Sequence, residues 1–101
     1  MASRIVQVEP FDLIVFGATG DLSQRKILPA LYHRDEQGQL PPEARIIGTS
    51  RRPMSDDEFR AFARAALEKF VEVEFRPPSV VDRFIARLSS VQDAAYKEDS
   101  W

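Results

Sequence analysis

The hydrophobic pattern changes its period at a glycine-rich turn near the start of the chain. Residues 11–16 (Phe-Asp-Leu-Ile-Val-Phe) form a short apolar run that ends abruptly at Gly17. A continuous run of this kind is typical of a strand buried on both faces of a parallel sheet. The pattern then predicts a helix, which Pro29 is expected to kink or locally break. The apolar residues of its buried face are Leu22, Ile27, Leu28, Leu31 and Tyr32.

The middle of the chain repeats the order of strand and helix. Residues 35–42 are polar and contain turn-forming Gly and Pro, so they predict a loop, and residues 45–49 (Arg-Ile-Ile-Gly-Thr) predict a second short strand. Ser55 and Glu58 have the spacing of a capping box, in which each side chain accepts the other residue's backbone N–H. They predict the start of a helix that continues to Val71. Its apolar face consists of Phe59, Phe62, Ala63, Ala66, Leu67, Phe70 and Val71.

Weaker signals cover the two ends of the chain. The prolines at 77–78 interrupt the chain, and Ser79 with Asp82 predicts another helix start. The apolar residues that continue this helix are Val80, Val81, Phe84, Ile85 and Leu88. Residues 89–93 predict a third, weak strand, and residues 1–10 predict a frayed N-terminal arm.

The order strand, helix, strand, helix, helix, strand predicts an α/β fold. Such alternation implies parallel pairing with right-handed crossovers. About three strands with flanking helices would be the first half of a Rossmann-like doubly wound parallel sheet, truncated before its second half. We therefore expect an arm over residues 1–10 and a partial nucleotide-binding domain over residues 11–101. Its open side should leave a large apolar patch or an unpaired strand edge, which favours association or partial disorder.

Composition excludes several classes of protein. The chain has 101 residues, 44% of them hydrophobic, and a net charge of −2. This length suits one small domain or a piece of a larger one, and the apolar share is too high for a disordered segment. The charge gives no reason to expect nucleic acid or a membrane surface, and we find no secretory signal or membrane span. Without Cys, and with His33 alone, we expect a soluble cytoplasmic domain without a structural metal.

The turn after the first predicted strand has the chemistry of a phosphate cradle. A glycine-rich strand-to-helix turn offers backbone N–H donors and the favourable end of the helix dipole. Gly17 accommodates positive φ, Gly20 allows close approach, Thr19 adds a hydroxyl, and Ser23 is small enough for close helix–strand packing. We interpret Asp21 as helping the helix to start through a capping or dipole interaction. The alternative is a plain turn that uses glycine only for its geometry.

Two basic features could complete such a site. Ser50-Arg51-Arg52 directly follows the second strand, where an acidic residue would accept from the ribose of NAD and an arginine would hold the 2′-phosphate of NADP. The alternative is a solvated basic turn. Lys26 has apolar neighbours along its helix, so its ammonium either snorkels to solvent or projects into a cleft. The helix over residues 59–71 is interpreted as core packing.

The run from Phe16 to Tyr32 closely resembles the N-terminus of the glucose-6-phosphate dehydrogenase family, in its Gly-Asp-Leu turn, its Lys and its aliphatic-x-Pro step. The resemblance covers about residues 11–88. It implies a coenzyme turn, a 2′-phosphate contact from Arg51, and a sugar-phosphate contact from Lys26. The turn residues that it implies, with Ser23 in place of the usual Ala, are Gly17, Ala18, Thr19, Gly20, Asp21, Leu22 and Ser23. Gln92 and Asp93 are weaker candidates as coenzyme neighbours.

The resemblance also implies an activity that this chain cannot complete. The family oxidises glucose 6-phosphate at C1 to 6-phosphogluconolactone, with hydride transfer to NADP+ (NAD is possible), and we expect the parent to be a homo-oligomer. The family's catalytic His–Asp segment has no counterpart here, and His33 is no substitute for it. We expect no catalytic residue in this chain and no dehydrogenase activity from it alone. The alternatives are a Gly-Ala-Thr-Gly-type NADP reductase or sensor, and a helical interaction module.

Overall fold

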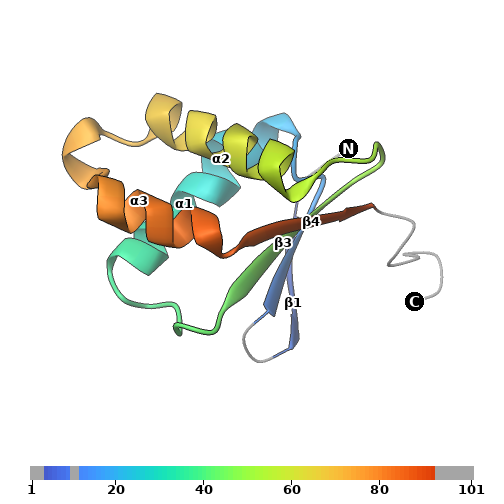
Figure 1. The fold of residues 1–101 in the computed structure, drawn as a ribbon, viewed down its shortest axis with the longest axis horizontal. Coiled ribbons are helices and arrows are strands. Elements are labelled where there is room, and N and C mark those ends of the chain that lie inside the picture. The colour runs from blue at the N-terminus through green and yellow to red at the C-terminus, as the bar shows by residue number, and fades with distance from the viewer. Residues whose placement is uncertain (1–3, 10–11, 93–101) are drawn as a thin grey trace.

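The chain folds around a four-stranded sheet with helices on one face. The structure is a computed structural model, and it describes residues 4–9 and 12–92. Three strands run parallel in the order β2 (Asp12–Phe16), β3 (Arg45–Ser50) and β4 (Leu88–Gln92). Figure 1 shows them beneath the helices. The predicted α/β class and three-stranded parallel sheet are confirmed, although β4 begins at Leu88, which the sequence assigned to the preceding helix.

A fourth strand, β1 (Arg4–Glu9), was not expected from the sequence. It pairs antiparallel with β2, from Arg4 opposite Phe16 to Glu9 opposite Asp12, with an irregularity between Gln7 and Glu9. The N-terminal arm is therefore not frayed over these six residues. The reason is that β2 would otherwise present a row of unpaired backbone groups at the edge of the sheet, and an adjoining extended segment can satisfy them.

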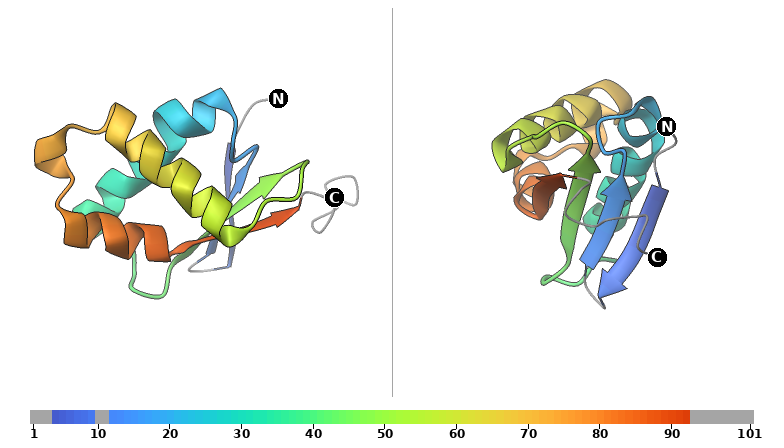
Figure 2. Two further views of the ribbon diagram at one scale, coloured as in Figure 1. Left: turned by 45° about the horizontal axis from the view of Figure 1, so that its top comes forward. Right: turned by 90° about the vertical axis from the view of Figure 1, so that its right-hand side faces the viewer.

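The helices cover the same face of the sheet, as Figure 2 shows. They are α1 (Leu28–Glu36), α2 (Asp56–Phe70) and α3 (Pro78–Ala86), with a short 3₁₀ turn, η2 (Val73–Phe75), between the last two. The core lies between this layer and the sheet, where fully buried Val15, Ile46 and Leu88 from the strands meet Phe59 and Phe84 from the helices. Parallel strands joined by helices on one face are the arrangement that the alternating pattern predicts.

A segment of π-helix, η1 (Ser23–Ile27), precedes α1 and explains how the chain accommodates Pro29. The backbone N–H of Leu28 donates to Ser23 O, five residues back rather than four. Proline lacks an N–H and its ring crowds the carbonyl four residues earlier, so the wider turn before it relieves both problems. The predicted local break is thus present as a π-turn, and helical structure continues to Glu36.

The two other helix starts differ in their chemistry. At α2 the capping box is confirmed: Glu58 N–H donates to Ser55 Oγ at 3.0 Å, and Ser55 N–H donates to Glu58 Oε1 at 2.8 Å. At α3 the predicted start at Ser79 is wrong, because the helix begins at Pro78 and has no side-chain cap. Proline suits the first helical position, since the missing N–H would have no intrahelical partner there.

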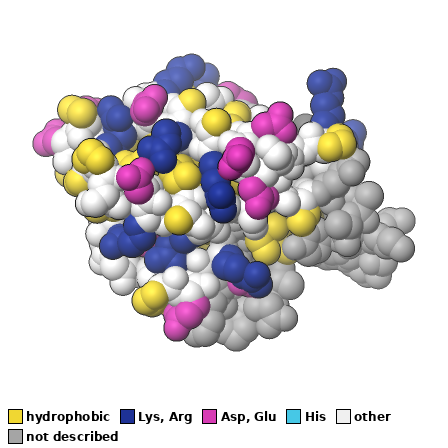
Figure 3. Space-filling model, viewed as in Figure 1, with side chains coloured by type: hydrophobic (Ala, Val, Ile, Leu, Met, Phe, Trp, Pro, Cys, Tyr) yellow, Lys and Arg dark blue, Asp and Glu magenta, His cyan; other side chains and the backbone are white. Residues whose placement is uncertain are grey.

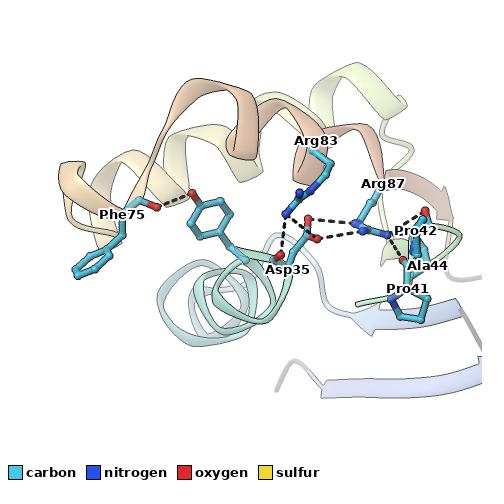
Figure 4. Close-up of polar contacts among 8 residues, drawn as sticks. Asp35, Pro41, Pro42, Ala44, Phe75, Arg83 and Arg87 are labelled. Atoms are coloured by element: carbon cyan, nitrogen blue, oxygen red, sulfur yellow. Dashed lines mark hydrogen bonds and ion pairs between the residues drawn. The ribbon is translucent and has the colours of Figure 1, made fainter. Parts of the chain in front are cut away.

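The predicted loop over residues 35–42 begins too early, because Asp35 lies in α1 and is 1% exposed. Arg87 forms a bidentate pair with its carboxylate (3.0 and 3.1 Å), and Arg83 donates to the Asp35 carbonyl at 2.7 Å. Arg87 also donates to the carbonyls of Pro41 and Ala44, as Figure 4 shows. This network joins α1, the end of α3 and the loop before β3, which explains how a carboxylate is buried here.

On β2, the sheet face away from the helices shows no part of the large apolar patch that we expected on the open side of the sheet. Side chains alternate along a strand, and Val15 belongs to the helix-side core, so Ile14 and Phe16 lie on the opposite face. They are 2% and 3% exposed. The large apolar side chains that are exposed among the described residues lie elsewhere: Ile5, Leu22, Phe70, Val73 and Phe75.

Candidate nucleotide-binding site

A cavity of about 570 Å³ lies where the carboxyl ends of β2 and β3 meet the start of α2. In open α/β sheets this edge of the sheet is where ligands bind. Its volume falls within the range of small-molecule sites in proteins. It is lined by Gly17, Thr19, Gly20, Ser50, Arg51, Arg52, Pro53, Met54, Glu58 and Phe62. The glycine turn and the basic turn, which the sequence singled out separately, therefore face one space.

The glycine turn has the backbone geometry that we predicted for its first residue. Gly17 adopts a φ of 66°, in the left-handed region that favours glycine. The N–H of Gly20 donates back to Gly17 O at 2.9 Å, and the N–H of Gln24 donates to Gly20 O at 3.1 Å. Helical hydrogen bonding thus starts from the Gly20 carbonyl, so the N–H groups of residues 21–23 have no acceptor within the helix.

Close packing holds this turn against β3. The N–H of Ala18 donates to Thr49 O at 2.9 Å, and Ala18 is fully buried. A Cβ on Gly48 would lie 2.7 Å from the Ala18 Cβ and 2.6 Å from the Phe59 ring. A side chain at position 48 would therefore displace both the turn and the first turns of α2. The sequence pattern places Gly48 in a predicted strand but gives no signal of this close contact.

The basic turn is held by a side chain of the strand that precedes it. Ser50 is 8% exposed and its Oγ donates to Arg52 O at 2.6 Å. Arg51 and Arg52 are exposed and line the cavity. A guanidinium presents a planar set of donors that matches a phosphate, so this turn has the right chemistry for a phosphate monoester.

The third wall comes from the segment before α2 and from the first turns of that helix, and it was not predicted from the sequence. Met54, Glu58 and Phe62 line the cavity. Glu58 and Phe62 are four residues apart and therefore share a helix face, which could have been recognised from their spacing. Phe62 packs against the core, as the interpretation of residues 59–71 expects, and it also lines this cavity. The basic turn contains no carboxylate in the sequence, but the structure places Glu58 in the lining of the same cavity.

The remaining candidate residues lie around the turn and do not line the cavity. Ser23 is fully buried, in keeping with its proposed packing role, and its Oγ has no hydrogen-bond partner in the described part of the chain. Asp21 is exposed and accepts from Arg25 Nε at 3.0 Å, so its carboxylate pairs along the helix rather than capping it. Leu22 and Lys26 are exposed on the same helical segment.

The last two candidates lie at the end of β4. Gln92 pairs with Ser50 in the parallel register, so its backbone lies beside the strand end that carries the basic turn. Asp93 lies outside the described residues.

Charge on the helical face is mixed, with basic and acidic side chains interspersed (Figure 3). None of the helices over residues 4–9 and 12–92 has the length and apolarity that a membrane crossing requires. Over the same ranges no cluster of three or more His, Asp or Glu side chains could hold a metal ion.

A parallel α/β sheet, a glycine turn that opens a helix and a basic turn after the next strand define a dinucleotide-binding domain of the Rossmann type. The comparisons identify the family. Residues 14–101 match the family profile described as glucose-6-phosphate dehydrogenase, NAD binding domain. The chain belongs to this family, which decides against the rival reductase and interaction-module interpretations.

Named relatives agree with this assignment. The chain is 48% identical over 101 residues to glucose-6-phosphate 1-dehydrogenase of Rhizobium meliloti, and 48% identical over 84 residues to that of Mycolicibacterium smegmatis. These alignments cover 100% and 83% of the chain but 21% and 17% of the relatives.

Solved structures show the same relationship. A glucose-6-phosphate dehydrogenase in complex with its substrate glucose-6-phosphate superposes with a TM-score of 0.68 at 31% identity, over 78% of this chain and 16% of that one. The enzyme from Mycobacterium avium superposes with the same score at 32% identity. The chain thus spans about a fifth of the length of the curated relatives it matches.

Proposed function

We propose that this chain is the NADP-binding portion of a glucose-6-phosphate 1-dehydrogenase. The observation that carries the proposal is the cavity that brings Gly17, Thr19 and Gly20 to the same space as Arg51 and Arg52. One end of this space offers backbone groups at a helix start, and the other offers guanidiniums. An NADP molecule has a pyrophosphate and a 2′-phosphate, so the two ends match its two anionic groups.

Each group of the site has a distinct role in this proposal. The first-turn N–H groups of residues 21–23 and the Thr19 hydroxyl would hold the pyrophosphate, while Gly17 and Gly20 let it approach the backbone. Arg51 would hold the 2′-phosphate, with Arg52 beside it. Met54 and Phe62 provide apolar surface for the adenosine. The coenzyme, when bound, supplies the nicotinamide that accepts a hydride; the residues described here bind and orient its adenosine half.

The activity of the whole protein follows from the family. We infer that the parent protein oxidises glucose 6-phosphate to 6-phosphogluconolactone with NADP+ as acceptor, in the cytoplasm and as a homo-oligomer. Lys26, which is exposed beyond the turn, would contact the sugar phosphate. The candidate residues of this chain hold no general base for the C1 hydroxyl, so we expect the 101-residue chain to bind coenzyme without turnover.

A titration of two coenzymes tests the assignment of Arg51. Arg51→Ala should raise the dissociation constant for NADP+ about tenfold or more, because a hydrogen bond to a charged group contributes about 1.5–3 kcal/mol. NAD+ lacks the 2′-phosphate, so its affinity should change much less. Arg34, exposed on α1, offers a matched control, and Arg34→Ala should leave both affinities unchanged. Equal losses for the two coenzymes with Arg51→Ala would contradict the phosphate-binding role.

A further inference from the structure

Residues 51–54 connect β3 to α2 and line the cavity. Two serine hydroxyls donate hydrogen bonds to backbone carbonyls of this segment. Ser50 Oγ donates to Arg52 O at 2.6 Å. Ser90 Oγ, from β4, donates to Met54 O. One hydrogen bond therefore fixes the segment at Arg52, and the other fixes it at Met54.

The two attachments are independent of each other. Ser90 also donates its backbone N–H to Asp56 Oδ1 at 2.8 Å, so the Met54 end is fixed to β4 through two contacts. The arginine end is held by Ser50, at the last position of β3. Loss of the Ser50 hydroxyl would therefore loosen Arg51 and Arg52 while Met54 stays in place.

This arrangement bears on one part of the ligand only. Guanidinium groups hold a phosphate well when their planar forks converge on it, and the backbone from which they extend sets that convergence. The adenosine surface at Met54 and Phe62 is common to NAD and NADP, whereas the 2′-phosphate belongs to NADP alone. A bond that orders only the arginine end would thus act on the choice between the two coenzymes.

We propose that Ser50 is a positioning residue for coenzyme selectivity, which acts through its hydrogen bond to the Arg52 carbonyl. The inference rests on the proposed function, because it presumes that the arginines receive the 2′-phosphate. Ser50 lines the cavity, but its hydroxyl proton is committed to Arg52 O, so its contribution is to fix the shape of the basic turn. Removing the hydroxyl should affect NADP+ and spare NAD+.

The test compares neighbouring hydroxyls in the 101-residue chain by calorimetric titration with NADP+ and with NAD+. Ser50→Ala should raise the NADP+ dissociation constant about 3- to 10-fold, the range of one net hydrogen bond, and shift that of NAD+ less than about twofold. Thr49→Val is the matched control, since the Thr49 hydroxyl is fully buried and has no hydrogen-bond partner in the described residues. It should leave the ratio of the two constants unchanged, as should Ser50→Thr, which keeps the hydroxyl.

A second measurement does not depend on ligand. Backbone ¹⁵N relaxation of Ser50→Ala should show lower order at the amides of Arg51 and Arg52, with Met54 unchanged. If the wild-type chain prefers NADP+ and Ser50→Ala keeps that preference, the positioning role is overturned and the proposed function stands. If Ser50→Ala weakens the binding of both coenzymes equally, the positioning role is also overturned, because equal weakening indicates that Ser50 has only a structural role. A wild-type chain that binds neither coenzyme contradicts both proposals.

Discussion

The charge around the candidate site is mixed, because Glu58 lines the same cavity as Arg51 and Arg52. Its Oε1 accepts from Ser55 N–H, so the capping box of α2 places a negative charge there. A carboxylate repels a phosphate and attracts a ribose hydroxyl. The strength of NADP binding therefore depends on the balance between these three residues.

The charge-neutral variant Glu58→Gln tests this balance. Glutamine serves in a capping box as well as glutamate does, so the helix start should be kept. We expect NADP+ to bind about 2- to 5-fold more tightly, because the variant removes the repulsion between two negative groups, which contributes about 0.5–1 kcal/mol in a partly solvated site. NAD+ binding should stay the same or weaken. Titration at low ionic strength measures both, and unchanged NADP+ affinity would show that Glu58 does not face the phosphate.

Asp12 and Arg45 form a charged pair at the N-terminal ends of β2 and β3, and this pair makes the stability of the fold depend on pH. Arg45 donates two hydrogen bonds to the Asp12 carboxylate, at 2.6 and 3.0 Å, and these lower the pKa of Asp12 below its usual value, against the opposing effect of burial. The lowered pKa means that the pair stabilises the fold above the unfolded pKa of about 3.9 and loses this effect as the pH falls through the folded value.

Unfolding in urea as a function of pH checks this sign. The wild-type chain should lose free energy of unfolding below about pH 4, and Asp12→Asn should flatten this part of the profile while lowering stability at pH 7. An Asp12→Asn chain whose profile is parallel to that of the wild type would exclude the pair as a source of the acid dependence.

At the scale of elements, the Asp35–Arg87 pair holds α1, the end of α3 and the loop before β3 together. Both side chains are nearly buried, at 1% and 7% exposed. Without Arg87, the buried Asp35 carboxylate would keep only the half-exposed Arg83, at 3.4 Å, as a charged partner. Breaking a buried pair typically costs 3–5 kcal/mol. The pair therefore governs the stability of the connection that brings the chain to β3.

Arg87→Ala should accordingly lower the free energy of unfolding by about 3 kcal/mol. Arg64→Ala is a suitable control, because its pair with Asp82 joins side chains that are 45% and 67% exposed and should contribute less than about 1 kcal/mol. Denaturant unfolding of both variants gives the comparison. Equal small losses would mean that the buried pair contributes no more than an exposed one.

The local elements could be predicted from sequence where their signals are local. The capping box at Ser55 and the apolar run of β2 depend on neighbouring residues, and both were predicted. β1 forms because an extended segment reaches the edge of β2. Asp35 can be buried because it pairs with Arg87, which lies 52 residues further along the chain. These contacts are long-range, and no local pattern encodes them.

The same distinction applies to the candidate site. The glycine turn and the basic turn were recognised because each is a short motif next to a strand end. The contributions of Met54, Glu58 and Phe62 arise from how α2 packs over β3, which the close contact between Gly48 and Phe59 permits. That packing is tertiary, so the third wall of the cavity required the structure.

At the scale of the whole molecule, β1 occupies one side of β2 and protects that edge of the sheet. In a doubly wound sheet, the strand that corresponds to β2 pairs on this side with the first strand of the second half of the sheet. β1 therefore lies where that second half would continue. Deleting residues 1–9 should expose the β2 edge and promote self-association. Sedimentation velocity of the shortened chain and the 101-residue chain at equal concentration checks this, and an equally monomeric shortened chain would contradict the protective role.

The central claim is that a dinucleotide lies across the glycine turn and the basic turn, and its most direct test is an NMR chemical-shift map of the ¹⁵N-labelled chain titrated with NADP+. We predict shift changes at the amides of residues 17–23 and 50–54, which saturate together, with little change at the distant end of α3. Changes confined to other elements, or none at millimolar NADP+, would contradict the account.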